Sequence, residues 1–440
     1  MNLRPKSTLA VAFLLAAGMT YYYFALLIPQ VRAVHASHQL DGGYYYGGDL
    51  YPIWFTTREL LFHHRNPYSN AMTGEIQTGL FGRTFDPRRP SDPPEHYRAF
   101  SYPLYTDVIA TPLTWLSFRQ VQYVLAFASP LLVAVGVWLW LVAFDLRIGA
   151  ASTAAVILLT MTSYAVLEAI FAQQPAILVG VSLATTGASL KRERYLLAGV
   201  CLAIAAIKPQ LMLLLAIWLL LWAVSDWDRR KTLIFGFVLT LALLLGASQL
   251  VLPGWFSDWR AALVEYRQYT EPPLVQFVLG KWLGGLVEFA LLLLGAGICW
   301  RTRRAAAMTR DFALTLSLAL VITIVTLPTG GAVYDHILLL PAILWLYSNR
   351  DQILRAARPL RLFVVLGLIA LSWQWIAACL VDILVWPTPG WRSAAQPLVF
   401  PLRTAAPLPF AVLAALVYFA IGTLRGNVHE PVSQSSPLAA

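Results

Sequence analysis

The feature that most constrains this chain is the repetition of long apolar runs, separated by short polar or basic segments, from residue 9 to residue 424. Hydrophobic residues make up 58% of the chain and charged residues only 12%. Inside a bilayer every backbone polar group must be bonded internally, so only helices and closed barrels can span it. The runs have the length of helices and lack the alternation of strands. The sequence therefore predicts an all-α polytopic membrane protein.

Twelve apolar segments carry this prediction, one before a long polar loop and the others after it. We place them at residues 9–28, 120–143, 150–166, 174–190, 195–207, 209–224, 232–252, 282–300, 311–328, 333–348, 362–384 and 407–424. Several are short for a bilayer of about 30 Å, above all the pair that meets at Lys208-Pro209-Gln210. Such segments fit if the bilayer thins or if their tips end inside a protein cavity.

The basic residues indicate which side of the membrane each loop occupies. They gather at 191–194, 229–231, 301–304 and 350–361, and positively charged loops stay in the cytoplasm. The loop at 29–119 then lies on the outer face, which in the inner membrane of a bacterium is the periplasm. Residues 1–425 form one transmembrane unit, and the polar residues 426–440 form a disordered cytoplasmic tail. Because these loops explain the net charge of +10, we expect no nucleic-acid partner.

The first apolar segment is compatible with two interpretations. A cleaved signal peptide would end at small residues, and Val34-His35-Ala36 offers such residues. The apolar core is longer than that of a usual signal peptide. We therefore favour an uncleaved signal anchor.

The cysteines argue against two kinds of stabilisation. Cys201, Cys299 and Cys379 all lie inside apolar segments, which predicts neither a disulfide framework nor a cysteine metal site. No His/Cys/Asp constellation occurs at the spacing of metal ligands. We predict neither a metal site nor a cofactor.

Polar residues within or at the tips of the apolar segments are the strongest indication of a functional site. Burying such groups in hydrocarbon is unfavourable, so a role in function is the first hypothesis for each of them. Snorkelling of charged side chains and hydrogen bonds between helices are the structural alternatives. On the predicted topology these residues converge at the outer face, and they are Glu168, Gln173, Gln174, Lys208, Gln210, Glu288, Asp335, His336 and Asp382.

Two of these positions suit an anionic ligand. The proline in Lys208-Pro209-Gln210 favours a break between two short helices, where the ammonium group can hold a phosphate. A lysine snorkelling at a helix end is the alternative. Asp335-His336 opens the tenth segment, and an N-cap role for the aspartate explains it as well as a site does.

The long loop contains the best candidate for a catalytic base, Asp49. This residue follows two glycines and precedes an amphipathic run over 50–64, which predicts a helix at the membrane interface. An N-cap role is natural here and is compatible with catalysis. A carboxylate at a helix N-terminus is kept ionised by the helix dipole and can take a proton from a sugar hydroxyl.

Several short motifs follow one another in a fixed order relative to the apolar segments. They are Gly48-Asp49-Leu50-Tyr51, Asn66-Pro67-Tyr68, Tyr102-Pro103-Leu104 with Thr111-Pro112-Leu113, Ala172-Gln173-Gln174-Pro175, Lys208-Pro209-Gln210 and Tyr334-Asp335-His336. In this order they resemble glycosyltransferase family 87, which includes polyprenyl-phosphate-mannose-dependent mannosyltransferases. The resemblance covers residues 49–341.

The resemblance implies a GT-C fold, a bundle of about twelve transmembrane helices whose first outer loop, with amphipathic interfacial helices, completes the active site. It implies a polyprenyl-phosphate-linked monosaccharide, mannose, as donor and a lipid-linked or glycan acceptor. By this analogy Asp49 is the general base, and Lys208 and His336 lie near the donor phosphate. We expect these two residues, with Arg98 or Arg267, to offset the charge of that phosphate. The further substrate contacts that we expect are Tyr51, Tyr102, Glu168, Gln173, Gln174, Gln210 and Asp335.

Two features depart from the family pattern. The sequence has Ala172-Gln173 where the family usually has a Gly-Gln pair, which puts the role of Gln173 in doubt. The insertion at 81–96, rich in proline and arginine, has no counterpart in the family. We expect it to touch the acceptor.

The predicted reaction is a single inverting displacement. Asp49 removes the proton of an acceptor hydroxyl while that oxygen attacks the anomeric carbon, and polyprenyl phosphate leaves from the opposite face. The competing class is a transporter or flippase of lipid-linked sugars, which would place polar groups near the midplane in paired repeats. A non-catalytic assembly subunit is a third possibility, and it would require no acid at position 49.

Overall fold

The computed structural model of the protein describes residues 5–37, 40, 46–86, 88–90, 92–327, 332–356, 358–385, 401 and 407–425. Within these residues the regular secondary structure is entirely helical, without a β-strand. The prediction of an all-α protein is therefore confirmed. The predicted tail at 426–440 lies outside the described residues.

The chain begins with a long helix that contains an irregular turn. It comprises α1 (Pro5–Tyr21), a π-helical turn η1 (Tyr22–Leu27) and α2 (Ile28–Ser37). The N–H of Ile28 donates to the carbonyl of Tyr23, five residues earlier, as a π-helix requires. Pro29 follows directly and has no N–H to continue the regular ladder. The helix therefore passes through Pro29 rather than ending at residue 28, where the sequence placed the end of the first span.

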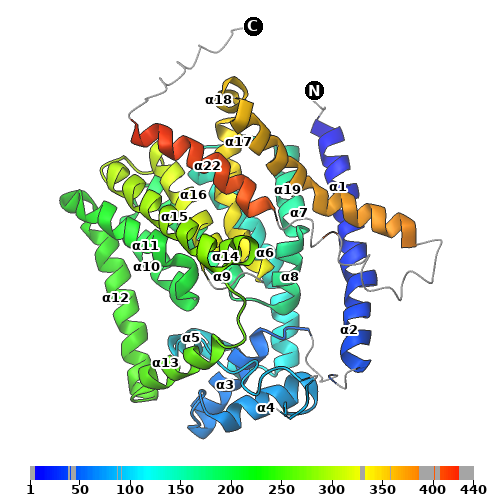
Figure 1. The fold of residues 1–440 in the computed structure, drawn as a ribbon. Helices are drawn as coiled ribbons and strands as arrows, with labels where there is room; N and C mark the ends of the chain where they lie inside the picture. Colours follow the sequence, from blue (N-terminus) through cyan, green and yellow to red (C-terminus); the bar gives the residue numbers. More distant parts are fainter. Residues whose placement is uncertain are drawn as a thin grey trace.

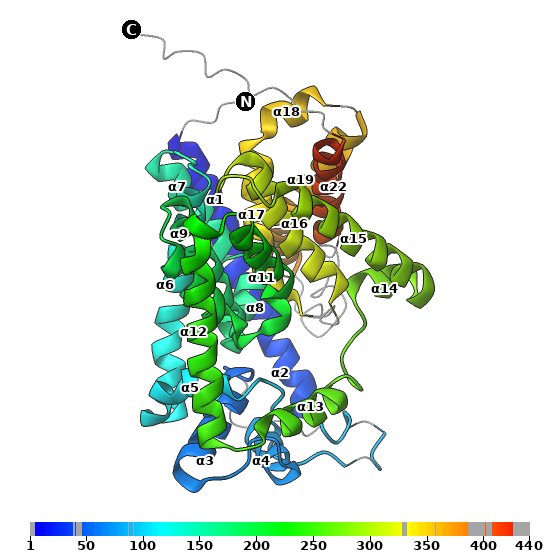
Figure 2. The ribbon, with the colours of Figure 1, turned by 90° about the vertical axis from the view of Figure 1, so that its left-hand side faces the viewer.

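Four helices gather at one end of the molecule, which we call the loop end. The long polar loop contributes α3 (Leu50–His63), α4 (Asn70–Phe81) and α5 (Tyr105–Ala110), and α13 (Trp255–Tyr266) joins them from a later part of the chain. Figures 1 and 2 show these helices together, with α18 and the N-terminus at the opposite end. The predicted helix at 50–64 is confirmed as α3.

The remaining helices form the bundle. In chain order they are η2 (Thr111–Trp115), α6 (Phe118–Ala143), α7 (Ala150–Met161), α8 (Tyr164–Ala172), α9 (Ala176–Lys191), α10 (Tyr195–Ile204), η3 (Ala205–Ile207), α11 (Pro209–Val224), α12 (Trp227–Val251), α14 (Leu274–Leu279), α15 (Lys281–Thr302), α16 (Arg310–Thr326), η4 (Val333–Leu339), α17 (Leu340–Ser348), α18 (Arg350–Arg355), α19 (Arg358–Val385) and α22 (Leu408–Leu424).

Every predicted apolar segment coincides with helix, but the count of about twelve membrane spans is not confirmed. Among the described residues five helices are long and apolar enough to cross a membrane, or six if α7 and α8, which meet at 60°, form one span. The 16 residues of α9 or α11 reach only about 24 Å at 1.5 Å per residue, less than a bilayer core of about 30 Å.

The helices differ in the surroundings of their side chains. Along α16 nearly all side chains are buried, so this helix lies inside the protein. Along α12 and α15, by contrast, large apolar side chains are exposed, among them Leu250 and Trp282, each 86% exposed. Apolar helices that leave such side chains uncovered suit contact with lipid. The bundle thus combines lipid-facing helices with shorter interior ones.

The helix α13 packs against the long polar loop through several polar contacts. Asn66 Nδ2 donates to Asp258 Oδ2 at 2.8 Å, and the indole N–H of Trp259 donates to the Ser101 carbonyl at 3.0 Å. His96 Nδ1 lies 3.5 Å from Glu265 Oε2. These contacts hold α13 against the segment that precedes α5.

Candidate functional site

A tight turn places Asp49 against the end of α8. Gly47 has a φ of 74°, and its N–H donates to the Phe171 carbonyl at 2.9 Å. The N–H of Asp49 donates to the Ala172 carbonyl at 3.2 Å. A side chain at position 47 would meet Gln173 Oε1, because a Cβ there would lie 2.6 Å from that atom. The turn that leads into α3 therefore requires, at Gly47, a backbone conformation that only glycine adopts readily.

The side chain of Asp49 does not cap the helix that follows it. Asp49 occupies the N-cap position of α3, yet its carboxylate makes no capping hydrogen bond. Instead Arg98 Nη1 donates to Oδ1, and Gln174 Nε2 donates to Oδ2. Asp49 is only 9% exposed. Its charge raises the pKa of the Arg98 guanidinium above the usual value.

The contacts continue from Gln174 to a buried ion pair. Lys208 Nζ donates to Gln174 Oε1 at 3.5 Å and to Asp335 Oδ1 at 2.8 Å. The ammonium group also lies 4.7 Å from the centre of the Tyr334 ring. Lys208 has a φ of −124° because the residue before a proline is pushed out of the helical region, so η3 ends there and α11 begins. The break turns the lysine toward the other polar groups.

Five side chains thus form one polar network, consisting of Arg98, Asp49, Gln174, Lys208 and Asp335. They come from positions that are far apart in the sequence and from both the loop end and the bundle. Their formal charges cancel, with two cations and two carboxylates. Asp335 Oδ2 is buried and has no hydrogen-bond partner among the residues that the structure describes, which is uncommon for a polar atom. This oxygen keeps its capacity to accept a hydrogen bond.

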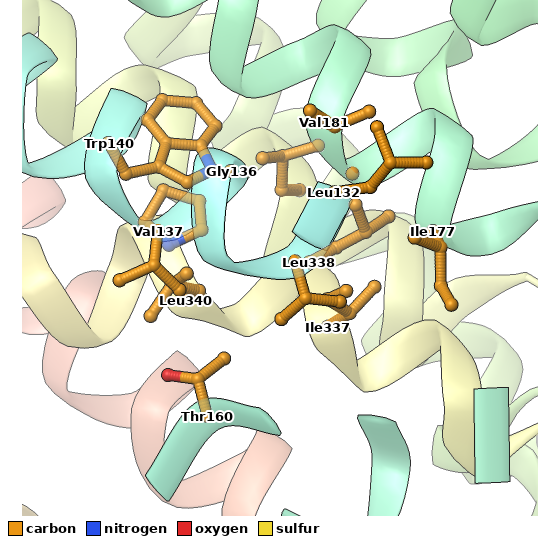
Figure 3. A pocket seen from close by; sticks show the side chains of 14 residues that line it. Leu132, Gly136, Val137, Trp140, Thr160, Ile177, Val181, Ile337, Leu338 and Leu340 are labelled. Atoms are coloured by element: carbon orange, nitrogen blue, oxygen red, sulfur yellow. The ribbon is translucent and has the colours of Figure 1, made fainter. Parts of the chain in front are cut away.

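An apolar crevice lies between α6, α9 and η4 (Figure 3). Val137 of α6, Ile177 and Gly180 of α9, and Ile337 and Leu338 of η4 contribute to its lining. Ile177 lies about one helical turn beyond Gln174. Ile337 follows Asp335 by two residues in η4. The element η4 therefore carries both a network residue and a wall of the crevice, and α9 follows Gln174 within two residues.

Comparison with protein families identifies the chain. The model of glycosyltransferase family 87 matches residues 100–328, just over half of the 440 residues. The chain belongs to glycosyltransferase family 87. No curated protein and no solved structure matches it. Membership of the family makes it a membrane glycosyltransferase. The matched region includes Gln174 and Lys208, whereas Asp49, Arg98 and Asp335 lie outside it.

Two other predicted residues of the glycosyltransferase lie close to the network. Glu168 of α8 accepts hydrogen bonds from the Tyr23 hydroxyl at 2.6 Å and the Tyr164 hydroxyl at 3.4 Å. Tyr102 is partly buried, and its carbonyl accepts a hydrogen bond from the Tyr68 hydroxyl at 2.8 Å. Burial, followed by the charge of Asp49, raises the pKa of the Tyr102 phenol.

Two predicted substrate contacts have structural partners in the glycosyltransferase. Gln173 has a φ of 52° and donates to the Gln122 carbonyl at 2.8 Å, which ties the end of α8 to α6. Tyr51 packs against Phe118 and Phe55, with ring centres 5.1 and 5.6 Å away. Both residues support the Asp49 turn and α3.

The structure does not join the other predicted residues to the polar network. Gln210 is partly buried in the first turn of α11, Arg267 is exposed at the end of α13, and His336 is partly buried next to Asp335. Glu288 pairs with Gln276 at 2.7 Å, while Asp382 lies against α1 near Gly18. The polar residues at the helix tips thus do not all converge on one place. Their roles in the glycosyltransferase stay predictions.

Some contacts at the site of this family 87 enzyme were not expected from the sequence. They involve the pairing of Arg98 with Asp49, the hydroxyls that hold Glu168 and the ring beside Lys208. Tyr23 gave a weak signal, because it precedes Pro29 inside an apolar run and a proline there indicates an irregular turn. The insertion at 81–96 is held to α4 by Gln77, whose Nε2 donates to the Glu95 and Tyr97 carbonyls at 2.6 and 2.9 Å. Its contact with an acceptor stays a prediction.

Proposed function

We propose that the protein transfers a monosaccharide, mannose, from a polyprenyl-phosphate donor to a hydroxyl of a lipid-linked or other periplasmic glycan. The observation that carries the proposal is the link from Asp49 through Gln174 to Lys208. It connects a carboxylate that can accept a proton with a cation that can hold a phosphate. A sugar linked to phosphate, with an attacking hydroxyl, requires both groups near one carbon atom. The proposed architecture is the GT-C bundle.

In the proposed reaction Asp49 takes the proton of the acceptor hydroxyl. The acceptor oxygen forms a bond to the anomeric carbon while the bond from that carbon to the phosphate oxygen breaks, which inverts the configuration. The electron pair of the broken bond leaves with polyprenyl phosphate. Lys208 offsets the charge that develops on this leaving group, aided by Arg98 and His336. The single negative charge gained by the phosphate equals the charge lost when Asp49 is protonated.

The apolar crevice supports a donor that carries a lipid. Two of its lining residues, Ile177 and Ile337, lie within three residues of Gln174 and Asp335 along the chain, so an apolar chain attached to a phosphate at Lys208 could extend toward it. Small residues keep the crevice open, because a Cβ at Gly180 would lie 3.5 Å from Ile337 and any longer side chain would enter the space. The first isoprene units of a polyprenyl chain suit such a lining.

The decisive experiment is sugar transfer by the purified protein in lipid nanodiscs. A panel of synthetic polyprenyl-phosphate sugars is supplied with a mannoside acceptor, and the products are identified by mass spectrometry. We expect transfer from polyprenyl-phosphate mannose with inversion at the anomeric carbon. Movement of an intact lipid-linked sugar across the bilayer, without transfer from any donor of the panel, would identify a flippase instead.

The proposed orientation places the loop end in the periplasm of the bacterial inner membrane. It follows from the basic clusters, and it is tested with single cysteines introduced after Cys201, Cys299 and Cys379 have been replaced by serine. Arg88 and Arg304 are both exposed in the structure. An impermeant thiol reagent should label Arg88→Cys in intact spheroplasts and should label Arg304→Cys only after lysis. The reverse pattern would invert the orientation.

A further inference from the structure

Glu168 differs from the carboxylates of the polar network in its partners. Asp49 meets Arg98 and Asp335 meets Lys208, so each has a cation. Glu168 is held by two neutral hydroxyls, those of Tyr23 and Tyr164, and both donate to the same oxygen, Oε2. In the described part of the chain, no basic side chain forms an ion pair with it. Its second oxygen, Oε1, keeps its capacity to accept a hydrogen bond.

Glu168 and Asp49 face the same end of the bundle. Glu168 precedes Ala172 by four residues in α8, just over one helical turn or about 6 Å along the axis. The carbonyl of Ala172 accepts the hydrogen bond from the Asp49 N–H at 3.2 Å. A ligand bound at Glu168 therefore lies within reach of the proposed base. Arg98 and Gln174 contact the two oxygens of the Asp49 carboxylate.

The two tyrosines that contact Glu168 belong to a cluster of aromatic rings. The Tyr23 ring meets those of Tyr164 and Phe171 edge to face, with centres 5.8 and 6.0 Å apart. The Tyr46 ring meets Phe171 in the same manner at 5.5 Å. Ligand sites are typically lined by aromatic side chains with few, well-placed polar groups. A carboxylate among phenol rings suits a neutral ligand that is rich in hydroxyl groups.

The π-helical turn accounts for the position of Tyr23. Tyr22 and Tyr23 begin this turn, and both are fully buried. A π-helical turn holds more residues than an α-helical one, so it changes the direction of the side chains before and after it. Such turns occur frequently at functional sites. Here the turn precedes Pro29 and accompanies the contact between Tyr23 and α8.

We propose that Glu168 binds a hydroxyl of a neutral acceptor sugar through Oε1, and that Tyr23 is the positioning residue that fixes the Glu168 carboxylate. The proposal rests on the proposed transferase function and assigns the acceptor subsite to the α1–α8 contact. The opposite charges of Glu168 and Lys208 then determine which substrate binds at each subsite. The negative charge of Glu168 repels the donor phosphate, whereas Lys208 attracts it.

The test compares the binding of two probes to the full-length protein in nanodiscs. Octyl α-D-mannoside represents a neutral sugar, and farnesyl phosphate represents the donor leaving group. We expect Tyr23→Phe to raise the dissociation constant of octyl mannoside about tenfold, because the carboxylate loses its shorter hydrogen bond. The dissociation constant of farnesyl phosphate should change by less than about twofold, since Lys208 is untouched. Tyr164→Phe removes the 3.4 Å contact and should have the smaller effect, about twofold to threefold.

Glu168→Gln is the second variant, because it keeps the side-chain size if Tyr23→Phe fails to fold. It should weaken octyl mannoside binding at least as much as Tyr23→Phe does. Equal weakening of both probes, or unchanged mannoside binding in both variants, would overturn the subsite. Wild-type protein that binds both probes but transfers no sugar would refute the proposed transferase function and leave the sugar subsite supported.

Discussion

Two buried aspartates of the same polar loop, Asp49 and Asp107, have opposite surroundings. They are 9% and 2% exposed. Asp49 accepts hydrogen bonds from the Arg98 guanidinium and the Gln174 amide, and Gln174 in turn contacts Lys208. Among the described residues, the side chain of Asp107 in α5 forms hydrogen bonds only with hydroxyls, since Thr57 and Thr56 donate to its Oδ1 at 3.0 and 3.4 Å. Its Oδ2 is buried and finds no hydrogen-bond partner in the described part of the chain.

The difference shows that burial alone does not indicate a site. Burial raises the pKa of Asp107 well above its usual value, and the hydrogen bonds from Thr57 and Thr56 oppose the effect only in part. The partners of Asp107 lie in α3, inside the same loop. The partners of Asp49 come from the bundle as well, through Gln174. A carboxylate that links separate elements to buried cations is the better candidate for chemistry.

The largest expected effect separates the two aspartates by activity. Asp49→Asn should reduce sugar transfer by about 10²- to 10⁴-fold, because a positioned base contributes about that much. The helix α3 should persist, since the Asp49 side chain does not cap it. Initial rates of transfer and circular dichroism of the same preparation provide the measurement.

Asp107→Asn is the matched control, since it makes the same chemical change at a comparably buried site. It should retain transfer within about threefold of wild type, as expected for a change that removes no catalytic group. If both variants lost activity equally, Asp49 would be no more than another structural acid of the loop.

The second prediction concerns the buried ion pair, which has no equivalent around Asp107. Lys208→Met should lower the free energy of unfolding by about 3 kcal/mol, because it leaves the Asp335 charge buried and unpaired. Adding Asp335→Asn removes that charge and should restore most of the loss. Chemical unfolding in detergent measures both variants. Farnesyl phosphate binding should be weak in each, and a double variant as unstable as Lys208→Met would contradict the pair.

A third change probes the crevice beside the network. Gly180→Leu should raise the KM for a polyprenyl-phosphate sugar about tenfold, because its side chain fills the space next to Ile337 and removes apolar contact with the lipid. Gly246→Leu is the control, since a Cβ at Gly246 has no neighbour within 4 Å. An equal KM for the two variants would show that the lipid lies elsewhere.

The smallest expected effect is a pH dependence of stability that arises from the burial of Asp107. A carboxyl whose pKa is raised by folding stabilises the protein most at low pH, and that contribution is lost as the pH rises toward its pKa in the folded state. Asp107→Asn does not titrate, so its stability relative to wild type should increase from pH 4 to pH 8, by about 1 kcal/mol. Thermal unfolding across this range measures the difference. A constant difference would mean that Asp107 does not change its protonation on folding.

The sequence predicted what depends on local composition. Apolar runs indicated the helices, and the proline after Lys208 indicated the break between η3 and α11, because both signals act within a few residues. Polar residues at the helix tips indicated Gln174, Lys208 and Asp335 as candidates. The membrane-span count was not confirmed, since apolarity alone does not distinguish an interior helix such as α16 from a lipid-facing one such as α12.

Partners distant in the sequence could not be predicted. Arg98 was expected near the donor phosphate, and its contact with Asp49 depends on the path of the whole loop. Arg267 was expected beside it but is exposed at the end of α13. Gln173 resembled its neighbour Gln174 in the sequence. The left-handed backbone of Gln173 directs its amide to Gln122, whereas the amide of Gln174 faces Asp49.

The long separation between Lys208 and Asp335 has a consequence for biosynthesis. A growing chain emerges from its N-terminus, so Lys208 enters the membrane while Asp335 has not yet been synthesised. A lysine inside the bilayer without a carboxylate is unfavourable. We therefore expect the hairpin of α10 and α11 to keep its lysine near water until η4 arrives. Final insertion of this hairpin and completion of the site become a single late step of assembly.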